Sequence, residues 1–585
     1  MTKKYSIDGK HRECLGMLLV ILAPLVVFSQ VGGHAFLGYD DPINIFQNPR
    51  VTEGSLANLL YFWQGPALGL YIPLTYNFWL VIAKLTQLLG LSGSGEILSP
   101  ILFHLANLLV HLGGTTLVYL ILRELMDHGP AAIAGALLFA LHPLQVEPVA
   151  WASGMKDLFS GFWSLMALWQ YLRFCQEKRK PRRTTHYLLG FLALLLAMFA
   201  KPTAVMVPLL AALLGWLMLA RPWRQVFIEL TPWLLCVIPV VILTNRAQAL
   251  AITVYQPLLW QRFLVAGDAV SFYLYKLLLP LNLGPDYGRL PELVLTQWWI
   301  YLTGTLPYLL AGVLLWKGSR PNLAAAGLFV APLIPVLGFL PFAFQEVSTV
   351  ADRYLYLAML GPAVGLALLW QQFQKQQTCR LSVAFMLVFL AITSTLQTSC
   401  WKNSLAFSSK AIKMNPRSWY SFLRYGIAQY SANHPEEAIR AFNQALAIKP
   451  DFTDALYGLG SVYYEQGNDE QAVAMFNKVI LIDQVNVPAA LGLGDIYRKN
   501  GRCDLAIRYY LIAVTSELDR AEYHVSLGEC YAALGRDTEA ITNFQAAIAT
   551  QPDYSAANSQ LAAIYEKRRE FDKANAILHN TRETR

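Results

Sequence analysis

The stretch LGMLLVILAPLVVFSQVGGHAFLGYDD, residues 15–41, sets the character of the whole chain. Residues 15–36 contain no Asp, Glu, Lys or Arg, and an apolar run of this length can cross a bilayer as a helix. Basic residues precede it, as they do in a signal peptide: Lys3, Lys4, Lys10 and Arg12. Because many further apolar segments follow, we interpret the run as an uncleaved first transmembrane helix.

The composition excludes a soluble multidomain enzyme. Hydrophobic residues make up 55% of the 585 positions and charged residues only 14%, which indicates a polytopic membrane protein with a more polar tail. The net charge of +8 does not indicate a nucleic-acid partner, because the basic residues punctuate apolar segments. Their largest cluster marks a cytoplasmic loop by the positive-inside rule: Arg173, Lys178, Arg179, Lys180, Arg182 and Arg183.

Eleven segments are predicted to span the membrane: 15–36, 97–122, 130–146, 158–172, 186–200, 202–220, 230–245, 293–316, 321–345, 354–373 and 381–401. The segment 263–283 is equally apolar, but it contains Asp268 and Lys276, so we expect it to be interfacial or re-entrant. The helix expected at 73–91 is also interfacial, because Lys84 interrupts it. With a cytoplasmic N-terminus, an odd number of spans places the C-terminal tail outside the cytoplasm.

The tail carries an internal repeat with a period of 34 residues. Small residues recur in register at Gly426, Gly460, Gly494, Gly528 and Ala562, and aromatic residues recur at Phe442, Phe476, Tyr510 and Phe544. This period, with small residues where paired helices cross, indicates five tetratricopeptide repeats over 417–582. Such a solenoid docks a protein or peptide in its groove, and the alternative is a spacer or dimerisation module. Cys503 and Cys530 could pair if the tail is extracytoplasmic, which spacing alone leaves open.

The acidic pair Asp40-Asp41 follows the first span directly. Charged groups at the mouth of a membrane helix indicate a functional site, although two helix-capping acids in a solvated loop are the plain alternative. Under the predicted topology, the other polar residues on the same side are His142, Glu147, Lys156, Asp157, Lys201, Arg246, Arg262, Arg289, Glu346, Asp352 and Arg353. Carboxylates backed by cations suit a reaction in which a base deprotonates an acceptor while a lipid-linked phosphate leaves.

The chain contains a set of short motifs: Tyr39-Asp40-Asp41, Asn48-Pro49-x-Val51, Pro73-Leu74-Thr75, His104-Leu105-x-Asn107, the run from Ala140 to Trp151, Lys156-Asp157, Ala200-Lys201-Pro202 and the run from Ala351 to Tyr356. Together with the repeats, they resemble the transmembrane and tetratricopeptide-repeat-containing family. The family in turn resembles the family-C glycosyltransferases, which take sugars from polyprenyl phosphates. The resemblance covers essentially the whole chain and implies an all-α fold, a polytopic membrane bundle followed by an α-solenoid.

The resemblance also implies roles for individual residues. Asp40 matches the catalytic base, and Asp41 would orient the acceptor or substitute as base. Arg353 would bind phosphate, while Ile72 stands where family members often carry a basic residue, which leaves phosphate neutralisation to Lys201, Arg289 or Arg353. The full set expected to bind substrate is Glu147, Lys156, Asp157, Lys201, Arg289, Asp352 and Arg353.

We therefore hypothesise a membrane glycosyltransferase that moves mannose or another hexose from a polyprenyl-phosphate donor to Ser or Thr hydroxyls of exported proteins. The expected domains are a transmembrane domain at 1–401 with outer loops 37–96 and 246–292, a lead-in helix at 402–416 and the repeats at 417–585. We expect an inner- or plasma-membrane protein with its active site and repeats outside the cytoplasm. We expect no cofactor besides the lipid-linked donor and no nucleic-acid partner; a divalent metal stays open, although the sequence shows no clustered metal-ligand spacing. A transferase for glycans or lipids, a non-enzymatic scaffold and a transporter are the alternatives.

Overall fold

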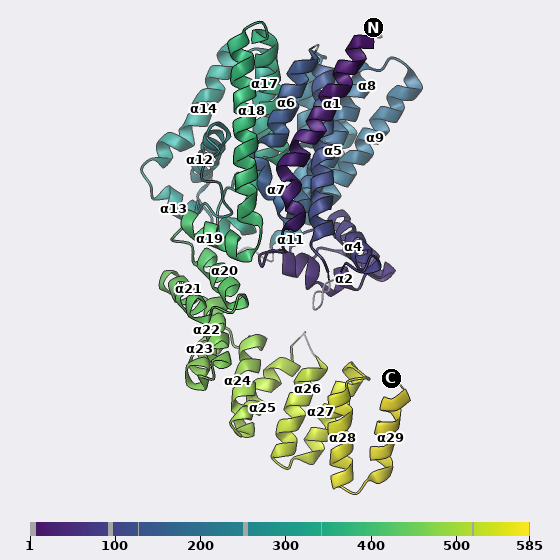
Figure 1. Cartoon of the computed structure of the whole chain (residues 1–585), viewed down its shortest axis with the longest axis vertical. Helices are drawn as coiled ribbons and strands as arrows, with labels where there is room; N and C mark the ends of the chain where they lie inside the picture. The colour runs from purple at the N-terminus through teal and green to yellow at the C-terminus, as the bar shows by residue number, and fades with distance from the viewer. Residues whose placement is uncertain are drawn as a thin grey trace. The chain divides into compact units, whose positions relative to one another are not determined.

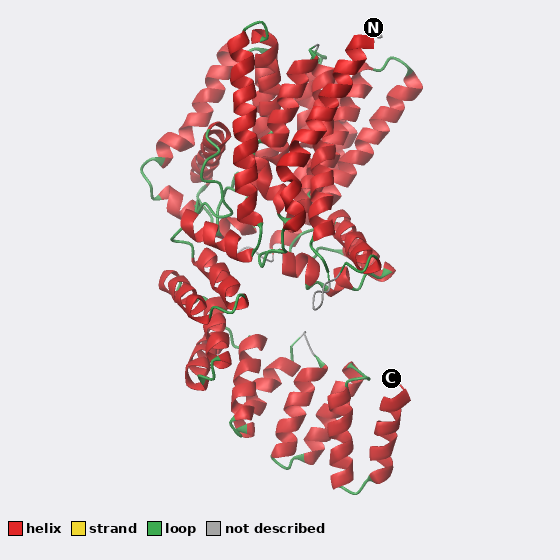
Figure 2. Cartoon of the chain, viewed as in Figure 1, coloured by secondary structure: helices red, strands yellow, loops and turns green. Residues whose placement is uncertain are grey.

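The computed structural model describes residues 7–91, 98–126, 128–249, 255–340, 342–516 and 520–583. The chain divides into two compact units, Met1–Arg417 and Ser418–Arg585. Throughout the described ranges the secondary structure is helical and contains no β-strand (Figure 2), which confirms the all-α fold class. Parts of the predicted outer loops, at 92–96 and 250–254, lie outside the described residues.

The first unit is a bundle of long helices with several short ones at one end (Figure 1). The long helices are α1 (Ile7–Phe28), α5 (Ile101–Leu125), α6 (Gly129–Leu141), α8 (Met155–Gln176), α9 (Lys180–Ala200), α11 (Trp223–Ala249), α12 (Leu259–Leu278), α14 (Ile300–Lys317), α15 (Arg320–Val330), α17 (Leu360–Phe373) and α18 (Gln377–Thr398). Helices that neighbour each other in sequence pack together, above all α8 with α9, α5 with α6 and α12 with α14. The helix α4 (Pro73–Leu88) and the short helices α2 (Pro49–Thr52) and α3 (Leu56–Gln64) gather at the end of the bundle where α1 finishes.

Among the described residues, six helices are long and apolar enough to cross a membrane: Cys14–Gly33, Ile101–Leu125, Lys180–Ala200, Trp223–Ala247, Ile300–Lys317 and Gln377–Trp401. The number rises to eight if two bent pairs, Gly129–Leu141 with Pro143–Ala150 and Asp352–Ala358 with Leu360–Phe373, each count as one span. The eleven predicted spans additionally include α8 and two shorter apolar helices, Pro202–Met218 and Arg320–Val336. The total of eleven therefore stays a prediction.

Helix–helix contacts in the bundle depend on small residues. Gly135 of α6 lies directly against α17, where a Cβ atom on Gly135 would be 2.4 Å from the carbonyl oxygen of Ala363 and 2.7 Å from Leu122 Cδ1. Close backbone approach through small residues is typical of membrane helices, because lipid offers no hydrophobic drive for larger side chains to associate. The α6–α17 crossing is therefore a fixed frame for the segments that leave these helices.

Several apolar segments that the sequence predicts as continuous spans are broken in the structure. Helix α6 ends at Leu141, and the chain bends by 52° into Pro143–Ala150; a second bend of 52° separates Asp352–Ala358 from α17. The predicted span 321–345 is also too long, because the helical segment ends at Val336 after Pro332 and Pro335. Proline lacks an N–H group and its ring displaces the preceding turn, which hydropathy does not register. Irregular backbone at this depth is tolerated where it lines a cavity.

Helix α12 does not meet the length and composition criteria for a membrane-crossing helix, and its interfacial or re-entrant placement stays a prediction. Figure 1 shows α12 nearly end-on, whereas α18 runs along the bundle. Two of its three charged side chains, Asp268 and Lys276, are buried against protein. Asp268 accepts a bidentate pair of hydrogen bonds from Arg289 and one from Thr303. Lys276 donates to the carbonyl oxygens of Leu281 and Asn282. Both charges are thus compensated inside the unit.

The described part of the second unit consists of five helix pairs: α20 (Trp419–Ser431) and α21 (Pro435–Ile448), α22 (Thr453–Glu465) and α23 (Asp469–Ile482), α24 (Val487–Lys499) and α25 (Cys503–Val514), α26 (Ala521–Ala533) and α27 (Asp537–Thr550), α28 (Ser555–Lys567) and α29 (Phe571–Glu583). The repeat aromatics fill the space that the glycines leave. The Phe476 ring of α23 packs against Gly460 of its own repeat and Gly492 of the next repeat. A Cβ atom on either glycine would lie only 2.5 or 2.7 Å from the ring, so Phe476 links the two repeats. Cys503 and Cys530 are buried free thiols.

The lead-in helix α19 (Ser404–Met414) falls in the first unit, by the division of the chain at Arg417. Its Ser404 hydroxyl accepts a hydrogen bond from the Gly38 amide at 2.8 Å. The Phe407 ring packs 5.3 Å from the Tyr39 ring, measured between centroids. This helix therefore supports the loop that carries the acidic pair.

Candidate active site

A cavity of about 550 Å³ lies in the first unit, and segments far apart in sequence meet there. It is lined by the loop after α1, the turn at Leu68–Leu70, the start of α8, the chain after α9, the end of α11 and the segments around Phe342 and Arg353. Its charged lining residues are Asp40, Lys156, Lys201 and Arg353, and most of the remaining wall is apolar. The structure thus brings one carboxylate and three cations to a largely apolar space.

Asp40 faces this cavity from the turn that follows α1. One carboxylate oxygen lies 3.1 Å from the Lys156 ammonium, and 30% of the Asp40 side chain remains exposed. Lys156, in the first turn of α8, lies 5.0 Å from the centre of the Trp151 ring. The ion pair fixes the direction of the carboxylate, while the exposed part leaves Asp40 accessible to a ligand.

Asp41 has a different role from its neighbour. Its carboxylate accepts hydrogen bonds from the Leu37 amide at 2.8 Å and from the Ser153 amide and hydroxyl at 3.0 and 2.5 Å. Burial raises the pKa of Asp41 to about 6, against the opposing effect of these hydrogen bonds. The side chain is buried and does not line the cavity. Asp41 therefore fastens the loop to Ser153, and the structure does not place it where a substitute base would act.

Arg353 is held on two sides by Glu147. The guanidinium lies 2.5 Å from one Glu147 oxygen, and the Arg353 amide donates to the other at 3.0 Å. Glu147 comes from α7 (Val146–Ala150), which follows the break after α6, and Arg353 from the turn Asp352–Tyr354. The Phe344 ring centre lies 4.2 Å from the guanidinium carbon, a cation–π distance. Arg353 lines the cavity, whereas Glu147 contacts Arg353 but does not line the cavity.

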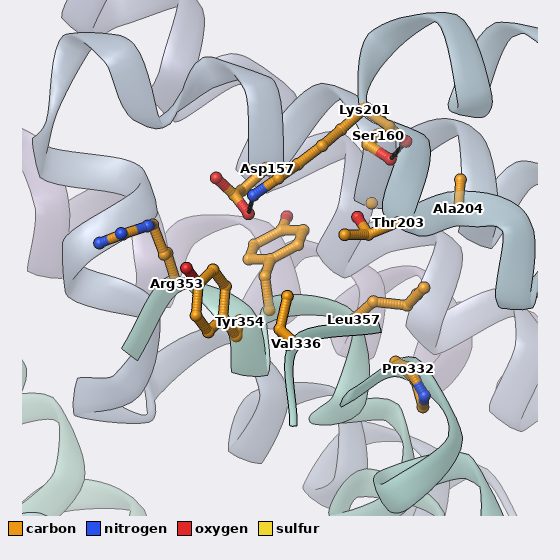
Figure 3. A pocket seen from close by; sticks show the side chains of 12 residues that line it. Asp157, Ser160, Lys201, Thr203, Ala204, Pro332, Val336, Arg353, Tyr354 and Leu357 are labelled. Atoms are coloured by element: carbon orange, nitrogen blue, oxygen red, sulfur yellow. Dashed lines mark hydrogen bonds and ion pairs between the residues drawn. The ribbon is translucent and has the colours of Figure 1, made fainter. Parts of the chain in front are cut away.

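Lys201 occupies the break between α9 and the helix Pro202–Met218. Its ammonium lies 2.5 Å from an Asp157 oxygen; the Asp157 side chain is buried and the Lys201 side chain is 14% exposed. Burial lowers the pKa of Lys201, and the Asp157 carboxylate opposes this effect. Lys201 lines the cavity, whereas Asp157 lines a smaller recess beside it (Figure 3).

Two of the expected substrate-binding residues have other partners. Arg289 forms the ion pair with Asp268 of α12, at 2.6 Å, and its guanidinium carbon lies 5.0 Å from the Trp299 ring centre. Asp352 accepts a hydrogen bond from the Tyr287 hydroxyl at 2.8 Å. Neither side chain lines the cavity, so the structure does not bring Arg289 or Asp352 to the site.

The other polar residues expected on this side are also outside the cavity lining. His142 Nε2 lies 3.1 Å from the Leu277 carbonyl oxygen, and Arg262 donates to the Phe339 carbonyl at 2.9 Å. Arg246 and Glu346 do not line the cavity either. Within the described ranges, no group of three or more His, Cys, Asp or Glu side chains could hold a metal ion.

Sequence reasoning missed residues that position the site without contacting the cavity. Asn107 of α5 donates from Nδ2 to the carbonyl oxygens of Pro148, Val149 and Trp151, at 3.3, 3.4 and 2.6 Å. These carbonyls lie at the C-terminal end of α7, the short helix that carries Glu147. Asn107 therefore satisfies carbonyl groups that have no partner within the helix and holds that end of α7 in place. The only signal was the place of Asn107 in the motif His104-Leu105-x-Asn107.

Comparison with known proteins finds a repeat family and a group of named relatives. Models of the tetratricopeptide repeat family match residues 429–493 and 491–555. The chain is 30% identical over 206 residues to the protein O-mannosyl-transferase Tmtc1 of Drosophila melanogaster, which is 35% of this chain and 23% of that one. It is 21% identical to the protein O-mannosyl-transferase F38B6.6 of Caenorhabditis elegans over 76% of this chain and 64% of that one. For TMTC1 of Homo sapiens the identity is 24%, over 72% and 54%.

The resemblance to the transmembrane and tetratricopeptide-repeat-containing family is confirmed. The chain spans less than two thirds of the length of each of these relatives. The crystal structure of YrrB, described as a TPR protein with an unusual peptide-binding site, is 25% identical over 30% of this chain and 90% of its own, with a TM-score of 0.28. With its apolar helices, the chain is a membrane protein that ends in tetratricopeptide repeats.

Proposed function

We propose that the protein is a membrane glycosyltransferase that moves a sugar from a polyprenyl-phosphate donor to a Ser or Thr hydroxyl. The observation that carries the proposal is a largely apolar cavity whose lining holds the accessible Asp40 together with Lys156, Lys201 and Arg353. The relatives are named protein O-mannosyl-transferases, which favours mannose as the sugar.

In the proposed reaction, Asp40 acts as the general base. The acceptor hydroxyl gives its proton to the Asp40 carboxylate, and the hydroxyl oxygen forms a bond to C1 of the sugar. The bond between C1 and the phosphate oxygen breaks, and the polyprenyl phosphate leaves with one more negative charge. Lys201 and Arg353 are the cavity cations available to meet that charge, since their own carboxylate partners stand outside the large cavity.

The apolar part of the wall suits a lipid-linked donor. Val241 of α11, Leu340 and Phe342 line the cavity from segments far in sequence from the loop that carries Asp40. A polyprenyl chain needs such a surface beside the phosphate cations, whereas a water-soluble nucleotide sugar does not. We therefore propose that the lipid tail passes along these residues and that no further cofactor takes part.

We also propose that the site and the repeats share the extracytoplasmic side and that the repeats dock the protein acceptor. The basic cluster between α8 and α9 supports a cytoplasmic position for that connection. Removal of 418–585 should abolish modification of a folded acceptor but spare a short Ser/Thr peptide at high concentration. Equal loss with both acceptors, in a truncated chain that still purifies as a folded protein, would contradict docking by the repeats.

The variant Asp40→Asn tests the base directly. Asn keeps the size of the side chain and can still accept from Lys156, so folding and insertion should persist. Transfer of mannose from a polyprenyl-phosphate donor should fall roughly a hundredfold to ten thousandfold, the contribution of a positioned base. The matched control is Glu53→Gln, an exposed carboxylate outside the cavity lining, which should transfer at the normal rate. Full transfer by Asp40→Asn would refute the assignment.

A further inference from the structure

A small recess of about 30 Å³, whose lining side chains are drawn in Figure 3, shares part of its lining with the large cavity. Five residues line both spaces: Lys201, Thr203, Val336, Arg353 and Tyr354. A volume of this size accommodates one or two groups as large as a water molecule. A ligand phosphate held by Lys201 and Arg353 would therefore have the recess immediately beside it.

One carboxylate oxygen of Asp157, in the lining of this recess, has no hydrogen-bond partner among the described residues. Asp157 Oδ1 accepts from Lys201, whereas Oδ2 is the buried oxygen that lacks a partner in the described ranges. Only 7% of the Asp157 side chain is exposed. Buried carboxylate oxygens without a partner are rare, because desolvation is costly unless a donor replaces the lost water.

The charges around the recess restrict the class of group that can satisfy Asp157. Asp157 is already paired with Lys201, and Arg353 with Glu147, so the buried charges balance. Inside the recess, an additional cation would lie beside Lys201 and Arg353, and an additional anion would lie against the Asp157 carboxylate, so either charge would be repelled. A neutral hydrogen-bond donor fits without either cost. The hydroxyl-bearing residues Thr203 and Tyr354 in the lining favour a group that both donates and accepts, which is a hydroxyl.

We propose that the recess is a subsite for one hydroxyl group of the transferred sugar, which donates a hydrogen bond to Asp157 Oδ2. The inference rests on the proposed function, because it takes the phosphate of a sugar-bearing lipid to lie at Lys201 and Arg353. A site built to bond a substrate hydroxyl rejects the analogue without it, since a buried polar atom is then left unpaired. Asp157 would thus select the sugar, separately from the chemistry at Asp40.

The test compares two lipids on the purified full-length protein: polyprenyl-phosphate-linked mannose and polyprenyl phosphate without sugar. In Asp157→Asn, the affinity for the mannose lipid should fall about tenfold or more, as expected for a lost hydrogen bond to a charged group. The affinity for the sugar-free lipid should stay the same or rise, because Lys201 loses its carboxylate partner. A panel of deoxymannose lipids should show one position at which the wild type, but not Asp157→Asn, discriminates about tenfold.

A second variant guards against failure of Asp157→Asn to fold. Thr203→Val keeps the side-chain volume and removes one hydroxyl from the recess, and it should weaken mannose-lipid binding by roughly threefold to tenfold. The matched control is Thr116→Val in α5, whose hydroxyl donates to the Leu112 carbonyl of its own helix. That control should bind both lipids as the wild type does.

The outcomes separate the inference from the function on which it rests. Equal loss of both lipids in Asp157→Asn would overturn the subsite, because Asp157 would then act only through Lys201 and the phosphate. Unchanged mannose-lipid binding in both variants would also overturn it and assign the recess to water. If the wild type binds neither lipid, the proposed function itself fails.

Discussion

The ion pair between Glu147 and Arg353 is expected to be a main anchor of the site, and a double-mutant cycle can test this. The variants are Glu147→Gln, Arg353→Met and the two together. Both Glu147 oxygens accept hydrogen bonds in the structure, one from the guanidinium and one from the Arg353 amide. The Glu147→Gln change therefore turns an amide nitrogen toward one of these two donors and leaves that donor unsatisfied. The Arg353→Met change keeps a similar side-chain volume and removes the charge.

The burial of the pair sets the magnitude. The Glu147 side chain is 2% exposed and the Arg353 side chain 8%, so each charge depends mainly on its partner for compensation. Removal of one partner of a buried pair costs about 3 to 5 kcal/mol, whereas replacement of both by uncharged groups is often close to neutral. Each single variant should therefore lose about 3 to 5 kcal/mol of unfolding free energy, and the double variant no more than either. The coupling energy is then about 3 kcal/mol or greater.

Urea titration of the purified protein in detergent micelles would measure these free energies. The pair Glu124–Arg173 is the matched control, since its atoms are 3.0 Å apart but the Arg173 side chain is 43% exposed. A coupling below about 1 kcal/mol is expected there. If the Glu147–Arg353 cycle gave a coupling no larger than the control, the pair would not anchor the site.

Two further predictions concern the frame of the site. Asp41 has a folded-state pKa of about 6 against 3.8, so its contribution to stability, about 3 kcal/mol, is present below pH 4 and lost as the pH rises through 6. Thermal unfolding at about pH 4.5 and about pH 7.5 should show this loss in the wild type but not in Asp41→Asn; identical pH profiles would contradict it. Gly135→Ala should destabilise the α6–α17 crossing by about 1 to 3 kcal/mol by overpacking. Gly365→Ala on α17, where a Cβ meets nothing within 4 Å, should be neutral or slightly stabilising by the same unfolding assay.

The repeat array was predictable because its determinants are local and periodic. An aromatic residue packs against a glycine of its own repeat and one of the next, and each turn needs a residue with positive φ. Gly467, Gly501 and Gly535 adopt φ of 73° to 75°, and Asn433 and Arg569 occupy the same place in the outer repeats with φ of 60° and 61°. A 34-residue period therefore encodes both the helices and their packing.

The ends of the membrane segments were less predictable. The segments predicted at 130–146, 321–345 and 354–373 are mostly apolar and contain no Asp, Glu, Lys or Arg, so hydropathy offered no reason to break them. The first two bend or stop at Pro143, Pro332 and Pro335, which remove backbone donors. The third bends by 52° between Ala358 and Leu360, just after Arg353 and Tyr354, which line the cavity. Tertiary structure, not composition, decides these positions.

The acidic pair shows the same limit at the level of single side chains. Asp40 and Asp41 are adjacent and chemically identical, and the sequence predicted both as catalytic. They diverge because Ser153, 112 residues away, binds Asp41, whereas Lys156 on the next helical turn binds Asp40 at the cavity wall. Arg289 was expected at the phosphate for its charge, but Asp268 on α12 binds it instead.

The arrangement of carboxylates around the cavity separates two tasks. Each cavity cation has one carboxylate partner: Lys156 has Asp40, Lys201 has Asp157 and Arg353 has Glu147. The charges thus balance before a substrate enters, which lowers the cost of holding three cations in a largely apolar space. Of the three carboxylates, only that of Asp40 faces the cavity, whereas those of Glu147 and Asp157 lie behind their cations. A phosphate can therefore approach Lys201 and Arg353 without direct repulsion from their carboxylate partners. The carboxylate that takes the proton, Asp40, is paired with the third cation, Lys156.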